Sequence, residues 1–227
     1  MFRTFMSKST AFKAAAAAAA LATVLGVSAC SGQTGEAAAA PPGKAAKGDP
    51  VTPATIANFT LKDQNGAPHE LYKMTNAKAI VITLQGVGCP IVQKMTPDLK
   101  DVQKAYEAKG VKFLMLNANN QDTIPMIKAE SDSFEIKMPI LKDEGQKVSE
   151  PLGVIRTAET FVIEPKTWKI LYHGALNDRL TYGRERAQAQ NNYVTDVLDA
   201  ELAGKAIPTN HQMADGCIID FPARQKG

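Results

Sequence analysis

The sequence Ala79-Ile80-Val81-Ile82-Thr83-Leu84, followed closely by Val87-Gly88-Cys89-Pro90-Ile91, decides the fold of this chain. The first stretch is a short apolar run rich in β-branched residues, which is typical of a buried strand. Apolar residues then recur three and four positions apart from Ile91 to Tyr106, which predicts an amphipathic helix ending near Lys109-Gly110. Cys89 is therefore expected at a helix N-terminus, where unpaired N–H groups and the macrodipole favour a thiolate.

The elements on either side predict an α/β domain with a mixed sheet covered by helices on both faces. An Asn65-Gly66 turn signal between residues 59–61 and 69–72 predicts an N-terminal hairpin. The elements expected downstream are strands over 111–116, 138–141, 161–165 and 170–174 and helices over 123–134, 146–152 and 193–202. The stretch from Lys205 to Gly227 has little periodicity, so we expect a poorly structured, movable tail that carries Cys217.

Residues 1–29 have the pattern of a secretory signal peptide. Three cations are followed by an apolar run from Ala14 to Val24, and no acidic residue precedes Glu36. That run is too short to span a membrane. The small residues before Cys30 resemble a bacterial lipoprotein signal, in which this cysteine is diacylated; ordinary cleavage that leaves Cys30 free is the alternative.

Residues 30–50 are rich in Ala, Gly and Pro without an apolar period, which predicts a flexible tether. Two or three acyl chains on Cys30 would hold the protein on a membrane surface, since stable anchoring needs more than one chain. We therefore expect an exported lipoprotein of the bacterial cell envelope. The remaining residues, 51–227, fit a single domain.

The expected mature chain is nearly neutral. Removing the three signal-peptide cations takes Lys plus Arg from 26 to 23, equal to the 23 Asp plus Glu. A basic patch with interleaved aromatic residues is missing, which argues against a nucleic-acid partner. Export makes a Cys89–Cys217 disulfide permissible, but sequence separation leaves open whether the two cysteines meet. His69, His173 and His211 lack metal-ligand spacing, so no metal site is expected.

The order of these elements resembles the thioredoxin fold and, within it, the peroxiredoxin-like redoxin family related to alkyl hydroperoxide reductases and thiol-specific antioxidant proteins. The motifs that carry the resemblance are Cys89-Pro90-Ile91, Thr96-Pro97-Asp98-Leu99, residues 109–113, Arg156-Thr157-Ala158-Glu159 with the strand after it, residues 172–179, residues 198–205 and Gly216-Cys217-Ile218-Ile219. The resemblance implies thiol-based redox activity without a bound organic cofactor. It implies that Cys89 is the attacking thiol, that Cys217 is a possible resolving cysteine, and that a partner thiol protein donates electrons.

Three positions depart from the family pattern. A Cys-x-x-Cys dithiol needs cysteine at position 86, where this chain has Gly86. Peroxiredoxins place proline seven and Thr or Ser three residues before the reactive cysteine, where this chain has Ile82 and Gly86. The cis-proline that usually faces the reactive cysteine is replaced by Ala158, for which we expect a trans peptide bond, because a non-proline cis bond costs about 3 kcal/mol.

Arg156 lies just before the strand expected beside the Cys89 loop. A guanidinium there would lower the pKa of a thiol and hold a developing anion; a surface salt bridge is the alternative interpretation. The glycines of Gly86-Val87-Gly88 and the following Pro90 predict an exposed turn at Cys89 rather than a buried structural cysteine.

The sequence thus favours a thiol oxidoreductase in which Cys89 attacks a protein disulfide or a peroxide and Cys217 resolves the product. Two other classes of function stay open. One is a copper-handling module in which Cys89 with Met95 or His173 binds Cu(I). The other is a redox-inactive thioredoxin-fold binding domain, which Gly86 and Ala158 favour.

Overall fold

The computed structural model describes residues 51–222 and 224. The chain divides into two units, Met1–Ala38 and Ala39–Gly227, and every described residue belongs to the second unit. The predicted signal peptide, tether and lipid-bearing Cys30 lie outside the described residues. Within the described part, none of the helices combines the length and the apolar composition that crossing a membrane requires.

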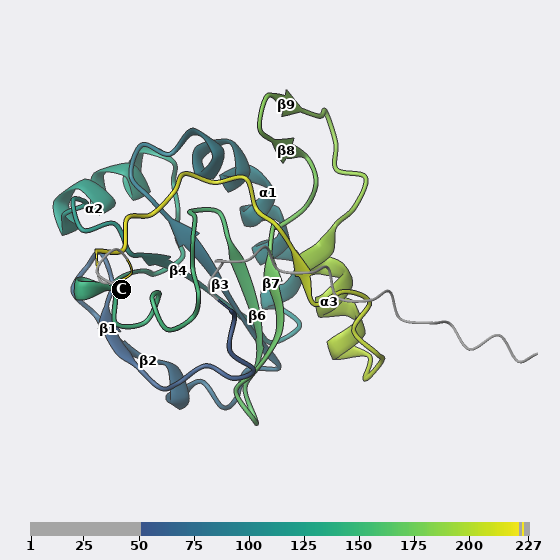
Figure 1. The fold of residues 1–227 in the computed structure, drawn as a ribbon. Helices are drawn as coiled ribbons and strands as arrows, with labels where there is room; N and C mark the ends of the chain where they lie inside the picture. Colours follow the sequence, from purple (N-terminus) through teal and green to yellow (C-terminus); the bar gives the residue numbers. More distant parts are fainter. Residues whose placement is uncertain (1–50, 223, 225–227) are drawn as a thin grey trace, which may run out of the picture. The chain divides into compact units, whose positions relative to one another are not determined.

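A six-stranded mixed sheet forms the centre of the domain (Figure 1). In spatial order its strands are β10 (His211–Gln212), β7 (Lys169–Gly174), β6 (Thr160–Glu164), β3 (Ala79–Gln85), β4 (Val111–Asn117) and β5 (Ile140–Lys142). Strands β3, β4 and β5 are parallel, whereas β6 runs antiparallel to both β3 and β7. This mixed sheet confirms the predicted α/β class.

The three helices lie close to their predicted positions. Within the described residues they are α1 (Pro90–Glu107), α2 (Ile124–Ser133) and α3 (Tyr193–Leu202). Two short 3-10 helices lie between strands, η1 (Leu71–Lys73) before β3 and η2 (Glu144–Gln146) after β5. The predicted helix over 146–152 is wrong, because η2 ends at Gln146 and turns follow it. The Asp143 carboxylate accepts the N–H groups of Val148 and Ser149, and such local side-chain bonds compete with helical hydrogen bonding.

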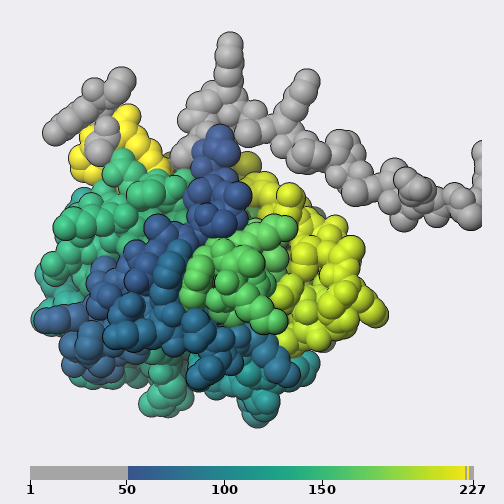
Figure 2. Space-filling model, turned by 90° about the horizontal axis from the view of Figure 1, so that it is seen from below, coloured from purple at the N-terminus to yellow at the C-terminus, as the bar shows by residue number. Residues whose placement is uncertain are grey.

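The predicted N-terminal hairpin is present as β1 (Thr60–Lys62) and β2 (Pro68–Glu70), which pair antiparallel. Its second strand ends earlier than predicted, because the chain enters η1 after Glu70. The segment before β1 lies against the turn between β6 and β7, where the N–H of Ile56 donates to the Trp168 carbonyl. Figure 2 shows this N-terminal segment in blue beside the green of the β6–β7 region.

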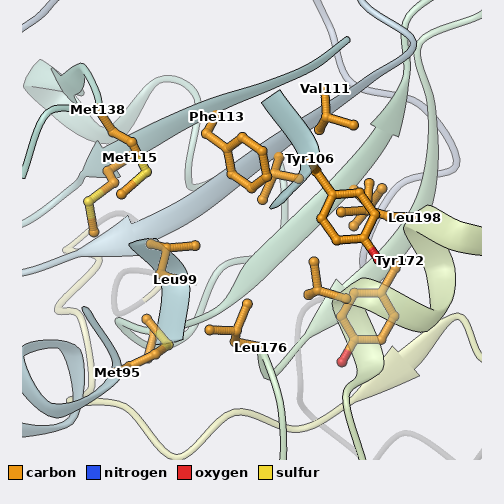
Figure 3. Packing of buried hydrophobic residues seen from close by; sticks show 14 of the residues in the cluster. Met95, Leu99, Tyr106, Val111, Phe113, Met115, Met138, Tyr172, Leu176 and Leu198 are labelled. Carbon is orange, nitrogen blue, oxygen red and sulfur yellow. The ribbon is translucent and has the colours of Figure 1, made fainter. Parts of the chain in front are cut away.

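Buried apolar side chains form two clusters, and alternate residues of β3 supply both. Val81 belongs to the cluster that includes residues of α1, α2 and α3, whereas Ile80 and Ile82 belong to the other cluster. Figure 3 shows the first cluster, in which Leu99 of α1 and Leu198 of α3 are among the side chains that pack with those of the sheet. The apolar period of β3, like the helical period of α1, therefore reflects burial.

Two further segments position the site. A short hairpin, β8 (Leu180–Thr181) and β9 (Arg184–Glu185), lies between β7 and α3. After α3 the chain pairs with β7 through β10 and then crosses back over the domain, in yellow in Figure 1. The described part of the tail has little regular structure beyond β10, as the sequence predicts. It is attached to the domain, because Ile219 donates its N–H to the Ile155 carbonyl and Ile218 bridges to Arg156.

Candidate active site

Cys89 is the N-cap residue of α1, as the sequence predicts. Its backbone is extended (φ −72°, ψ 113°), Pro90 opens the helix, and the N–H of Gln93 donates to the Cys89 carbonyl. The expectation that Cys89 lies in an exposed turn is wrong, because only 4% of the residue is exposed. The Thr157 hydroxyl and the Cys217 thiol both contact the Cys89 sulfur.

The structure brings Cys217 directly to Cys89. The two Sγ atoms are 2.8 Å apart, both cysteines are free, and Cys217 is the exposed member of the pair. A disulfide bond is about 2.05 Å long, so bond formation needs a further approach of less than about 1 Å. The two cysteines that the sequence singles out, 128 positions apart, therefore form one pair.

Thr157 fixes this arrangement through four contacts. Its N–H donates to the Cys217 carbonyl (2.9 Å), its Oγ1 accepts the N–H of Cys217 (2.8 Å), and the same Oγ1 lies 3.1 Å from the Cys89 sulfur. The same hydroxyl also lies 3.5 Å from the Cys217 carbonyl. Because that carbonyl already accepts the N–H of Thr157, the hydroxyl proton is available to donate to a thiolate at the nearer Cys89 sulfur. Sequence reasoning missed Thr157. Its position was a usable signal, because it directly precedes Ala158, the residue at which the resembling family has its proline.

The surroundings shift the pKa values of the two thiols in opposite directions. Burial alone raises the pKa of the Cys89 thiol, but hydrogen bonds from the Cys217 thiol and the Thr157 hydroxyl outweigh it, so this pKa lies below the ordinary cysteine value. Backbone N–H groups of Val92 and Cys217 act in the same direction. Burial and the hydrogen bond to Cys89 raise the pKa of the Cys217 thiol to about 11. The arrangement therefore favours a thiolate at Cys89 and a protonated thiol at Cys217.

Two carboxylates that sequence reasoning missed hold the loop before Cys89. Asp122 accepts the N–H of Val87, and Glu130 accepts the N–H of Gly88, each at 2.9 Å. Glu130 also accepts a hydrogen bond from the Gln93 side chain in the first turn of α1. Asp122 lies in the connection between β4 and α2, and Glu130 lies in α2, so these two segments fix the loop before Cys89.

Arg156 contacts the segment that carries Cys217. Its Nη1 donates to the Tyr182 hydroxyl (3.1 Å) and to the Gly216 carbonyl (3.5 Å). Its backbone N–H donates to the Glu159 carboxylate at 2.9 Å. The structure thus places Arg156 beside the residue that precedes Cys217, while an effect of its charge on the acidity of a thiol stays a prediction.

His173 is engaged elsewhere. Its Nε2 lies 2.8 Å from the Glu159 carboxylate, its Nδ1 lies 2.5 Å from the Thr52 hydroxyl, and its ring stacks on Phe161. Because both ring nitrogens have partners, His173 is not arranged to bind a metal ion together with Cys89. Over residues 51–222 and 224, no group of three or more His, Cys, Asp and Glu side chains is placed to hold a metal ion.

Ala158 adopts a backbone conformation that proline cannot adopt. Its φ is +63°, its side chain is buried, and its N–H donates to the Leu84 carbonyl at 2.7 Å. All peptide bonds within the described residues are trans, as we expect for Ala158. The loop that usually carries the family's proline is therefore held here by a backbone hydrogen bond to the end of β3.

The chain belongs to the Redoxin family, whose model matches residues 46–191. Its sequence is 28% identical over 107 residues to the thiol-disulfide oxidoreductase ResA of Bacillus anthracis, covering 47% of this chain and 60% of the relative. It is 27% identical over 131 residues to the chloroplastic peroxiredoxin Q of Triticum aestivum, covering 55% of this chain and 57% of the relative. The chain thus spans about 60% of the length of the curated relatives it matches.

A solved structure confirms the fold. The hypothetical protein SMc02350 from Sinorhizobium meliloti 1021 superposes with a TM-score of 0.69 at 23% identity, covering 78% of this chain and all of that one. At this identity the match supports the fold alone. Together with the family match and the mixed sheet, it confirms the thioredoxin-like fold that the sequence predicts.

Replacing the Thr157 hydroxyl should raise the pKa of Cys89. In a chain whose only thiol is Cys89 (Cys30→Ser, Cys217→Ser), we expect Thr157→Val to move the midpoint of iodoacetamide alkylation to higher pH, because a donor to the thiolate is lost. Thr157→Ser is the matched control and should keep the low midpoint. Equal midpoints for the Val and Ser variants would show that the hydroxyl does not stabilise the thiolate.

Restoring the family's proline should damage the fold. Ala158→Pro removes the N–H that binds the Leu84 carbonyl and requires φ near −65° instead of +63°. We expect it to lower the free energy of unfolding by at least about 2 kcal/mol, whereas Ala158→Gly, which accepts positive φ, should change it by about 1 kcal/mol or less. Urea denaturation followed by circular dichroism measures both, and a proline variant as stable as the glycine variant contradicts this account.

Proposed function

We propose that the protein is a thiol-based oxidoreductase in which Cys89 attacks a protein disulfide and Cys217 resolves the mixed disulfide. The observation that carries the proposal is the 2.8 Å separation of the two sulfur atoms, with the pKa lowered at Cys89 and raised at Cys217. A lowered pKa increases the fraction of the thiolate that attacks disulfides, and the second thiol already contacts the attacking sulfur.

The reaction proceeds in two exchanges. The Cys89 thiolate attacks one sulfur of the substrate disulfide, forming a mixed disulfide and releasing one substrate thiolate, which takes a proton from water. Cys217 then loses its proton, attacks the Cys89 sulfur and releases the second substrate thiolate. The substrate gains two electrons and two protons, and the chain is left with a Cys89–Cys217 disulfide. A thiol protein that donates two electrons restores the starting state.

The burial of Cys89 determines how this cycle starts. A protein disulfide cannot reach the Cys89 sulfur while the Cys217 thiol is in contact with it, because only 4% of residue Cys89 is exposed. Cys217 is itself exposed and is held by hydrogen bonds to Thr157, each of which contributes about 1 kcal/mol. The residues on either side of this segment, Ala214 and Ile219, are buried, so the part of the tail that can move aside is the short stretch around Cys217. Local displacement of the tail therefore precedes attack by Cys89 on a large substrate.

Peroxide is the second candidate substrate, and the same pair of thiols serves it. The Cys89 thiolate attacks one peroxide oxygen, releasing an alcohol or water and forming a sulfenic acid. The Cys217 thiol then condenses with the sulfenic acid, releasing water and forming the same disulfide. Small oxidants suit a buried sulfur, and the Thr157 hydroxyl provides a polar group 3.1 Å from it. The match to peroxiredoxin Q supports this route, as the match to ResA supports disulfide exchange.

The remaining parts of the proposal come from the sequence. Arg156 would contribute positive charge beside Cys217, through the hydrogen bond of its guanidinium to the Gly216 carbonyl. A lipid on Cys30 would anchor an exported protein to the bacterial cell envelope, facing an oxidising compartment that holds the thiol-donor partner. The burial of Cys89 is the observation that favours the competing class, a redox-inactive binding domain.

Cysteine variants of the full chain separate these functions. In assays of insulin disulfide reduction with dithiothreitol and of hydrogen peroxide consumption, Cys89→Ser should lower the rate with the preferred substrate at least about 100-fold. Cys217→Ser should leave Cys89 able to attack once and accumulate a mixed disulfide or sulfenic acid, detectable by mass spectrometry. Cys30→Ser is the matched control and should keep the wild-type rate. If wild type and Cys89→Ser are equally slow in both assays, the domain is redox-inactive.

A further inference from the structure

Tyr182 makes two hydrogen bonds to the residues directly before Cys217. It lies in the turn of the β8–β9 hairpin and is 60% exposed, yet its hydroxyl donates to the Gly216 carbonyl at 2.5 Å. Its backbone N–H donates to the Asp215 carboxylate at 3.2 Å. The Arg156 guanidinium donates to the same hydroxyl at 3.1 Å. The hairpin therefore holds the two residues before Cys217, in addition to the contacts that Thr157 makes with Cys217 itself.

The hairpin is tied in turn to α1, the helix that begins after Cys89. Glu185 of β9 pairs with Lys94 at 2.7 Å, and Arg179 pairs with Asp98 at 2.6 Å and with Glu185 at 3.1 Å. Lys94 and Asp98 are one turn apart on α1, so these ion pairs attach the hairpin to the first half of the helix. The hairpin is thus attached to the helix whose N-cap is Cys89, and this defines the position of Tyr182 relative to the Cys89 sulfur.

We propose that Tyr182 is a positioning residue that fixes Cys217 against Cys89 through the Gly216 carbonyl. The proposal rests on the proposed function, because it concerns the formation of the Cys89–Cys217 disulfide. Without the Tyr182 hydroxyl, the Gly216 carbonyl keeps only the guanidinium bond of 3.5 Å. The segment before Cys217 then samples more positions, and the effective concentration of the Cys217 thiol at the Cys89 sulfur falls.

Equilibration with glutathione measures this effective concentration in the full chain. The two protein thiols and one glutathione disulfide give the Cys89–Cys217 disulfide and two glutathiones, so that two electrons and two protons pass to glutathione. Its equilibrium constant, obtained from the alkylated fractions by mass spectrometry, has the units of a concentration. We expect Tyr182→Phe to lower it roughly three- to tenfold, the equivalent of one hydrogen bond. A merely structural role for the ring does not change this constant, because phenylalanine keeps the ring.

Two further variants serve as the control and the comparison for Tyr182→Phe. Arg184→Ala, in the same hairpin, is the matched control and should leave the constant within about twofold of wild type. Gly216→Ala should lower it more than Tyr182→Phe does, because an added Cβ would lie 1.7 Å from the Thr157 carbonyl oxygen. An effect of Gly216→Ala without an effect of Tyr182→Phe overturns the role of Tyr182 and leaves the two-cysteine site intact. A wild-type chain that forms no Cys89–Cys217 disulfide overturns both proposals.

Discussion

A single buried hydroxyl, that of Thr157, links the two halves of the site. Its oxygen accepts the N–H of Cys217 and lies 3.1 Å from the Cys89 sulfur, so one side chain both places the tail and stabilises a thiolate. A hydroxyl has one proton and two lone pairs. Because a lone pair is used by the tail, the proton can be given to Cys89 without leaving another polar group unpaired. The position of the tail and the acidity of Cys89 are therefore coupled.

This coupling resolves a conflict between burial and reactivity. Burying a thiol stabilises its neutral form, and a buried Cys89 surrounded by apolar groups alone would be unreactive. Hydrogen bonds from the tail and from Thr157 reverse that effect and lower the pKa. The same tail that makes the sulfur acidic also covers it. When the tail moves away, Cys89 becomes more exposed and its pKa rises. A small substrate is therefore favoured while the tail covers Cys89, and a large substrate can react only after the tail is displaced.

The sequence predicted the features that depend on local pattern. The strand of Ala79–Gln85 and the helix that starts after Cys89 are recognisable because burial imposes their periods, and the fold follows from the order of such elements. The burial of Cys89 and the attachment of the tail could not be predicted in this way. They depend on contacts between Thr157 and Cys217, which lie 60 residues apart and belong to irregular segments without a period. The prediction of a helix after Gln146 was wrong for a similar reason. The Asp143 carboxylate accepts backbone N–H groups there, and the sequence pattern does not reveal these bonds.

Two glycines, Gly86 in the Cys89 loop and Gly216 in the tail, lie directly against Thr157. A Cβ atom at Gly86, where a Cys-x-x-Cys dithiol needs its other cysteine, would lie 2.6 Å from Nδ2 of Asn119 and 2.7 Å from Cγ2 of Thr157. A Cβ at Gly216 would lie 1.7 Å from the Thr157 carbonyl oxygen. Thr157 thus occupies the space that both side chains would need. A cysteine at position 86 would require the side chains of Asn119 and Thr157 to shift. Because Thr157 also holds Cys217, a dithiol in the Cys89 loop would disturb the hydrogen bonds that place the tail cysteine.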